Sequence, residues 1–290
     1  MFQSMATNVT SYEMDCLGED IRALENDVLS AQEASAVGLK LVDLFTRVVN
    51  NAKTTLVRPF SSKPMLRSEF SAFEKGHKRQ LKSLLKNVDI SESETRVVVP
   101  ENFVTTYPNA VSQIQKGLDI LGFEDTLSRF ASTIDDLEKD GVERYYLHIE
   151  RLNKEKTKIT KLSKTAAESI TKEIFNPLKW DKKKEKQAKI VLISAKNMEE
   201  TQDVIRNWEA YHKQAIDAHN HLENLNKRVE KIIDRIVKME TVQKKTISAI
   251  YNYLHAMGVQ VDMYGAFIHH SQVVEHNYIV SAKILIKEHL

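Results

Sequence analysis

A heptad pattern of apolar residues from Thr201 to Met257 constrains the fold of this chain more than any other feature. Counting in sevens from Thr201, fourteen of the seventeen seam positions are apolar. An apolar period of 3.5 residues held over this length is typical of helices that wrap around one another. We therefore predict a single helix over 201–257 whose seam faces another helix.

Large apolar side chains at these positions form the interaction seam that we predict. It comprises Trp208, Tyr211, Leu222, Leu225, Val229, Ile232, Ile236 and Met239. Burial of each should contribute about 1.5–3 kcal/mol.

Gln243 and Thr246 interrupt the pattern and leave two interpretations open. Either these polar residues set the register of the helices, or the helix frays or changes its partner there.

The rest of the chain is poor in residues that end helices, with eight glycines and five prolines in 290 residues. Few turns in a long chain imply long helices. Apolar residues at helical spacing predict further helices over 17–56, 69–88, 109–121, 124–140, 142–176 and 267–286. Gly122, Gly258 and Gly265 are the expected breaks between neighbouring helices.

Two short segments do not follow the helical pattern. β-branched and aromatic residues dominate 95–107, and Pro100 and Pro108 bound its halves, so we expect a short edge hairpin or an extended strap there. The apolar run 190–193 is either a helical turn or a short strand.

These patterns predict an all-α fold, an elongated bundle of long helices with coiled-coil segments and one short β-like strap near 95–107. We expect four regions: an N-terminal long helix (1–60), shorter helices plus the strap (61–140), a long helical coiled-coil region (141–258) and a C-terminal helical tail (259–290). The seam of 201–257 can close on other helices of the same chain or on a second copy, and both arrangements stay open.

The sequence offers little support for catalysis or metal binding. Glu209 and His212 have the Glu-x-x-His spacing of helical di-iron proteins, but such a site needs this motif twice and the chain has it once. We interpret the neighbouring His219 and His221 as solvent-facing or seam-flanking. No phosphate-binding glycine loop or nucleophile motif is present, and Cys16 is the single cysteine. We predict no enzymatic activity, no metal and no cofactor.

Basic residues are concentrated in two stretches, 47–86 and 144–189, each with a net charge of +8. Within the second stretch we predict a basic face at Lys182, Lys183, Lys184 and Lys186. The stretch 151–189 could bind nucleic acid or an anionic surface, because Trp180 lies beside the lysines. The interspersed acidic residues fit a solvated helix face instead.

The segment Thr95-Arg-Val-Val-Val-Pro-Glu-Asn-Phe-Val-Thr-Thr-Tyr107 lies between a lysine-rich helix and a helix that begins near Asn109. With the long helices that follow, this layout resembles helical virion proteins of large tailed bacteriophages, internal-head or accessory. The resemblance implies a non-enzymatic assembly role and identifies no functional residue.

We therefore expect a structural or assembly protein that works through helix–helix contacts with protein. The partners would be other copies of the chain or other structural subunits, with nucleic acid as a further candidate partner. No window approaches eighteen uncharged apolar residues, so we expect no transmembrane segment. The expected location is the cytoplasm of the cell that makes the protein, or the virion.

Overall fold

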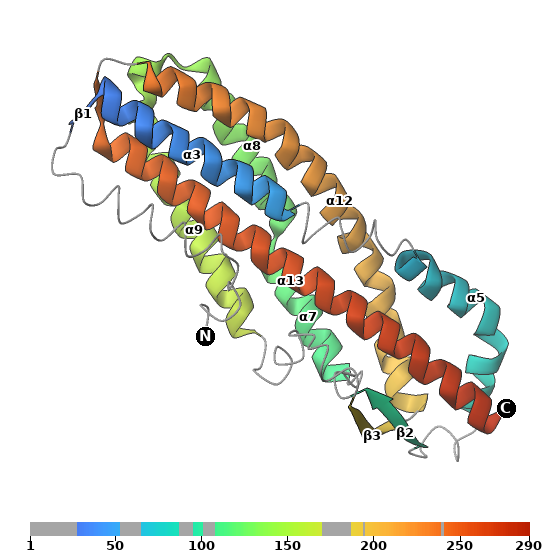
Figure 1. The fold of residues 1–290 in the computed structure, drawn as a ribbon. Helices are drawn as coiled ribbons and strands as arrows, with labels where there is room; N and C mark the ends of the chain where they lie inside the picture. The colour runs from blue at the N-terminus through green and yellow to red at the C-terminus, as the bar shows by residue number, and fades with distance from the viewer. Residues whose placement is uncertain are drawn as a thin grey trace. The chain divides into compact units, whose positions relative to one another are not determined.

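A computed structural model describes residues 28–52, 65–86, 95–100, 108–169, 187–193, 195–238 and 241–290. The helices are α3 (Ala31–Ala52), α5 (Met65–Lys86), α7 (Pro108–Leu121), α8 (Phe123–Lys139), α9 (Ile149–Glu168), α12 (Ala195–Val237), α13 (Lys244–His289) and the 3₁₀-helix η2 (Val142–His148). The strands are β1 (Val28–Ser30), β2 (Thr95–Pro100), β3 (Ala188–Ile193) and β4 (Thr241–Gln243). The predicted all-α class is confirmed, because helices dominate this part of the chain (Figure 1).

The chain forms two compact units, each assembled from three separate segments. Unit 1 contains Met1–Val57, Ile120–Ala167 and Gln214–Gly265, and unit 2 contains Arg58–Asp119, Glu168–Lys213 and Ala266–Leu290. The helix α12 belongs to unit 2 up to Lys213, and α13 belongs to unit 1 up to Gly265. The four regions expected from the sequence are contiguous, whereas the contacts in space join segments that are distant along the chain.

In unit 1, α8 packs against α13 through aromatic rings. Phe123 stacks on Tyr264 with ring centroids 4.6 Å apart, and Phe130 lies 5.5 Å from Tyr253. The residue numbers rise along α8 while they fall along α13, so the two helices are antiparallel. Such pairs contribute about 0.5–1.5 kcal/mol beyond the area that they bury.

Ion pairs join α9 and α12 to α8 in unit 1. Arg129 of α8 lies 3.1 Å from the carboxylate of Glu155 in α9. Arg228 of α12 lies 2.5 Å from Asp135 and 2.6 Å from Glu138, both in α8. The Arg228 guanidinium lowers the pKa of both carboxyl groups, mainly through the hydrogen bonds that it donates. These contacts place α9, α12 and α13 around α8.

Gly122 makes the corner between α7 and α8 where the sequence predicts a break. Its φ of 50° lies in the left-handed region, which glycine adopts without a Cβ clash. The carbonyl of Leu121, at the end of α7, accepts a 2.8 Å hydrogen bond from Nε2 of Gln260. A fully buried glutamine of α13 thus satisfies a carbonyl that α7 leaves unpaired.

In unit 2, α5 packs on α12 and α13. Phe70 meets Tyr278 of α13 edge-to-face at 5.7 Å, and the ammonium of Lys283 lies 5.9 Å from the centre of the Phe73 ring. Glu74 accepts hydrogen bonds from Arg206 and from Gln202 of α12. The apolar face of α5 is therefore covered by the helices of its own unit.

The prediction of one helix over 201–257 is wrong, because α12 ends at Val237 and α13 begins at Lys244. Residues 241–243 form β4, which pairs antiparallel with β1 in the register Val28↔Gln243. The break falls at Gln243, where the apolar seam is already interrupted. Strand pairing with a segment more than 200 residues away replaces the helical turn there, and a local heptad pattern cannot reveal such a partner.

The expected breaks at Gly258 and Gly265 do not occur, because α13 continues through both. A helical glycine costs only about 1 kcal/mol relative to alanine. Burial on every face of α13 offsets this cost: Tyr251, Met257 and Met263 point in three directions about 120° apart around the helix, and each is at most 7 % exposed. This all-round burial is typical of a helix in the middle of a bundle.

The apolar run 190–193 forms a strand, which settles the alternative left open by its sequence. It lies in β3, which pairs antiparallel with β2 from Thr95↔Ile193 to Pro100↔Ala188. The strap predicted at 95–107 is a strand over 95–100, and 101–107 lie outside the described residues. We call this β2–β3 pair the ribbon.

Candidate functional site

Six of the eight residues of the predicted interaction seam are buried inside the chain. Trp208 and Leu222 are fully buried, Leu225 and Ile236 are 1 % exposed, and Val229 and Ile232 are 3 % exposed. Tyr211 is half-buried, and Met239 lies outside the described residues. The apolar surface of these residues is therefore already used within a single copy of the chain.

Tyr211 is the polar member of this set, and it joins α12 to α7 in unit 2. Its hydroxyl accepts a 2.5 Å hydrogen bond from the Gln115 side chain and donates one to Asp119. Burial, followed by the hydrogen bond to Asp119, raises the pKa of Tyr211 to about 12. The group stays neutral at physiological pH and acts as a structural hydrogen-bond donor.

The predicted basic face at Lys182, Lys183, Lys184 and Lys186 lies outside the described residues. The part of 151–189 that is described divides between the units, with α9 in unit 1 and β3 in unit 2. On α9, Lys154, Lys158 and Lys161 are exposed, and Arg151 pairs with Asp136 of α8.

The three histidines that stand close together in the sequence have three different surroundings. His212 is buried in unit 2, where its Nε2 lies 2.8 Å from the Ser271 hydroxyl. That hydroxyl donates to the carbonyl of Ile268, so Nε2 of His212 acts as the donor toward it. In unit 1, His219 is buried 3.4 Å from Glu223, and His221 is exposed. Among the described residues, no three histidine, cysteine or acidic side chains gather as a metal site.

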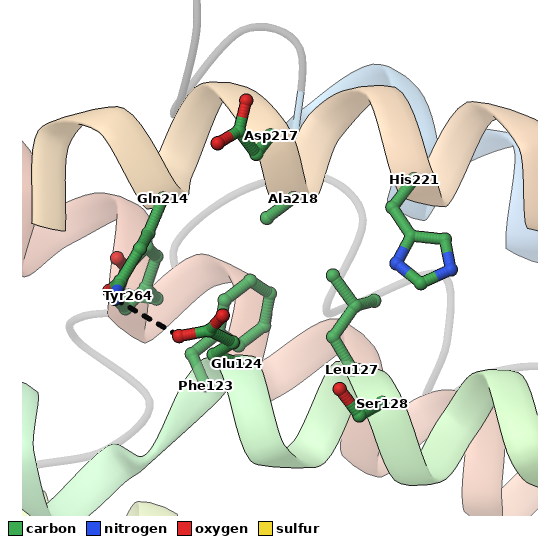
Figure 2. A pocket seen from close by; sticks show the side chains of 9 residues that line it. All are labelled: Phe123, Glu124, Leu127, Ser128, Gln214, Asp217, Ala218, His221 and Tyr264. Atoms are coloured by element: carbon green, nitrogen blue, oxygen red, sulfur yellow. Dashed lines mark hydrogen bonds between the residues drawn. The ribbon is translucent and has the colours of Figure 1, made fainter.

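A small hollow of about 150 Å³ opens on unit 1 between α8 and α12 (Figure 2). Phe123, Leu127, Ala218 and Tyr264 supply its apolar lining, and Glu124, Ser128, Gln214, Asp217 and His221 supply its polar lining. The Gln214 side chain donates a 3.0 Å hydrogen bond to Glu124, drawn as the dashed line in Figure 2.

The chemistry of this hollow is limited by its size and its exposure. Ligand sites usually enclose roughly 300–1,000 Å³, so this hollow suits a single side chain or a small cation. Glu124, Asp217 and His221 are exposed to water, which keeps their interactions weak. Ser128 and His221 both line it, but no hydrogen bond joins them in the structure. The hollow therefore supports no assignment of a catalytic site.

The ribbon carries a cross-strand pair of exposed apolar residues. Val98 of β2 lies opposite Ile190 of β3, and these side chains are 70 % and 67 % exposed. Arg96 and Ala188, on the same face of the ribbon, are also exposed. Sequence reasoning identified both segments but not their pairing, and alternation within β2 would have placed Arg96 and Val98 on one face.

Among the described residues, no helix combines the length and the apolarity that crossing a membrane requires. Comparisons of the chain with protein-family models, with curated proteins and with solved structures find no match.

Proposed function

We propose that this chain is a non-enzymatic structural or assembly protein that works by protein–protein contact. Its partners would be further copies of itself or other structural subunits. The layout around 95–107, which resembles that of helical virion proteins of large tailed bacteriophages, fits such a role. The cross-strand pair of exposed apolar residues on the ribbon carries this proposal.

The predicted helix–helix contacts supply the internal framework of such a subunit. Trp208 in unit 2 and Leu222 in unit 1 are fully buried within the chain. Because these seam residues are buried within one chain, they hold its long helices together and leave little apolar surface for a partner. Contact with other subunits therefore requires side chains that remain exposed.

The ribbon has two properties that favour contact with protein. A two-stranded ribbon is marginally stable on its own, and each outer edge presents backbone groups that can pair with another strand. Within the described part of the chain, β2 and β3 pair only with each other. Contact between two copies would bury Val98 and Ile190, each worth about 1.5–3 kcal/mol when fully covered.

The proposal is tested by charging the ribbon in the full-length chain. The variant Val98→Lys with Ile190→Lys should sediment as a smaller species than the wild type while its circular dichroism stays helical, because both side chains are exposed. Leu39→Lys on α3 is a matched control, since Leu39 is also 70 % exposed. The control should sediment like the wild type.

Two results would contradict this assignment. If the double lysine variant and the wild type sediment alike, the ribbon makes no contact between subunits. If only Leu39→Lys reduces the size, the contact lies on α3 instead.

A further inference from the structure

The exposed side of α5 carries five basic residues and, among its described side chains, no acidic one. Lys75, Lys78, Arg79, Lys82 and Lys86 are all exposed, and we call them the α5 stripe. At 100° per residue they fall within about 100° of the helix circumference. The buried residues Phe70, Phe73, Leu81 and Leu84 occupy the opposite side of the helix.

The positive charge of the stripe is not neutralised by its described neighbours. Glu74, the one acidic side chain described on α5, binds Arg206 and Gln202 of α12 instead. None of the five basic side chains makes a hydrogen bond or an ion pair with a described residue. Three pairs, Lys75–Arg79, Lys78–Lys82 and Lys82–Lys86, place like charges four residues apart, which destabilises a helix.

This arrangement differs from an ordinary solvated helix face. On α9, the exposed lysines share their helix with Glu150 and Glu155, and Glu155 pairs with Arg129 of α8. Unit 2, which contains α5, has 22 lysines and arginines against 17 acidic residues, whereas unit 1 has 20 against 23. The segregated charge of α5 therefore points to a polyanionic partner.

We propose that the α5 stripe binds the phosphate backbone of a nucleic acid. The eleven-residue step from Lys75 to Lys86 spans about 16 Å, a length over which duplex DNA presents about ten charges. Four of the five residues are lysines, which bind phosphate as point charges and do not read bases. Binding is then independent of sequence.

A lipid surface fits this helix less well than a nucleic acid does. Helices that lie on membranes insert an apolar face among the lipids. On α5 that face is already covered, as the contacts of Phe70 with Tyr278 and of Phe73 with Lys283 show. Gln80 and Ser83, which directly follow stripe residues in the sequence, are exposed and can donate hydrogen bonds to phosphate.

Fluorescence anisotropy of the full chain with a labelled 30-base-pair duplex of arbitrary sequence tests this proposal. Five phosphate contacts predict a slope of about −4.5 in log K against log salt concentration. Lys78→Gln with Lys82→Gln and Lys86→Gln should reduce the slope to about −2 and weaken binding at least about tenfold at low salt. Lys154→Gln with Lys158→Gln and Lys161→Gln on α9, which changes the net charge equally, should bind like the wild type.

Thermal unfolding adds a readout that does not depend on a ligand. Removing like-charge pairs from an exposed helix face should leave the melting temperature of the α5 variant equal to or above that of the wild type. The proposal is overturned if the wild type does not bind the duplex or if the α9 variant loses as much affinity as the α5 variant. It is also overturned if phosphatidylserine vesicles bind to the stripe in preference to DNA.

Discussion

Two titratable residues on α13, the half-buried Asp262 and the buried His270, make opposite contributions to stability as pH changes. Burial raises the pKa of Asp262 in unit 1 to about 7, and burial lowers the pKa of His270 in unit 2 to about 4. Each shift favours the neutral form in the folded chain. Acidification from pH 7.5 to 4.5 therefore stabilises the fold through Asp262 and destabilises it through His270.

Replacing Asp262 with asparagine removes the pH-dependent contribution of this carboxyl group to stability. The charged carboxylate opposes folding above pH 7, so Asp262→Asn should raise the free energy of unfolding at pH 7.5. The gain is at most about 4 kcal/mol, and less to the extent that water reaches the side chain. Urea unfolding followed by circular dichroism measures it. A carboxyl group with an ordinary pKa would give no gain at pH 7.5.

Replacing His270 with leucine removes the second effect. Neither ring nitrogen has a hydrogen-bond partner among the described residues, and His270 is 1 % exposed, so protonation below the unfolded pKa of about 6.5 is costly. The wild-type side chain should cost roughly 2–3 kcal/mol of stability between pH 7.5 and 4.5, and His270→Leu should abolish that loss. Unfolding curves at both pH values provide the test. If acidification lowers the free energy of unfolding of the variant as much as that of the wild type, His270 is not the cause of the loss.

At the scale of the elements, α12 depends on apolar contacts within unit 1. Leu225 and Ile232 are 1 % and 3 % exposed. Leu225→Ala should lower the free energy of unfolding by about 2–5 kcal/mol, because it removes apolar contacts and leaves a cavity. Chemical denaturation measures this loss, with Lys227→Ala, on the exposed side of α12, as the matched control. Equal stability of the two variants would show that the seam is not part of the core.

The sequence predicts the elements of this fold better than it predicts their partners. Gly122 marks the corner between α7 and α8, and helical spacing locates both helices. The end of α12 is missed because β4 pairs with β1, a contact that no local pattern contains. Gly258 fails as a break because burial around it outweighs the helix propensity of a single residue.

The sequence alone does not predict the surface features, because their position depends on which side of each helix or strand is covered. The excess of basic residues over 47–86 is visible in the sequence, but the α5 stripe emerges only once the opposite face of α5 is known to be buried. Likewise, Val98 and Ile190 come together only through the pairing of two segments about ninety residues apart. Long-range pairing of this kind is not encoded in local periodicity.

At the scale of the whole molecule, the proposed surfaces have different physical signatures. Contact through Val98 and Ile190 is apolar and should be little affected by salt. Contact through the α5 stripe is electrostatic and should weaken steeply as salt is added. Salt dependence therefore separates assembly of the chain from its binding to nucleic acid.

The central claim, that copies of this chain assemble through apolar contact, is tested most directly by light scattering of the wild-type protein at low and high salt. A single chain has a mass of 33.3 kDa. We predict a mass that is a multiple of this value and that persists at high salt. A mass of one chain under both conditions, or assembly that dissociates when salt is added, would contradict the claim.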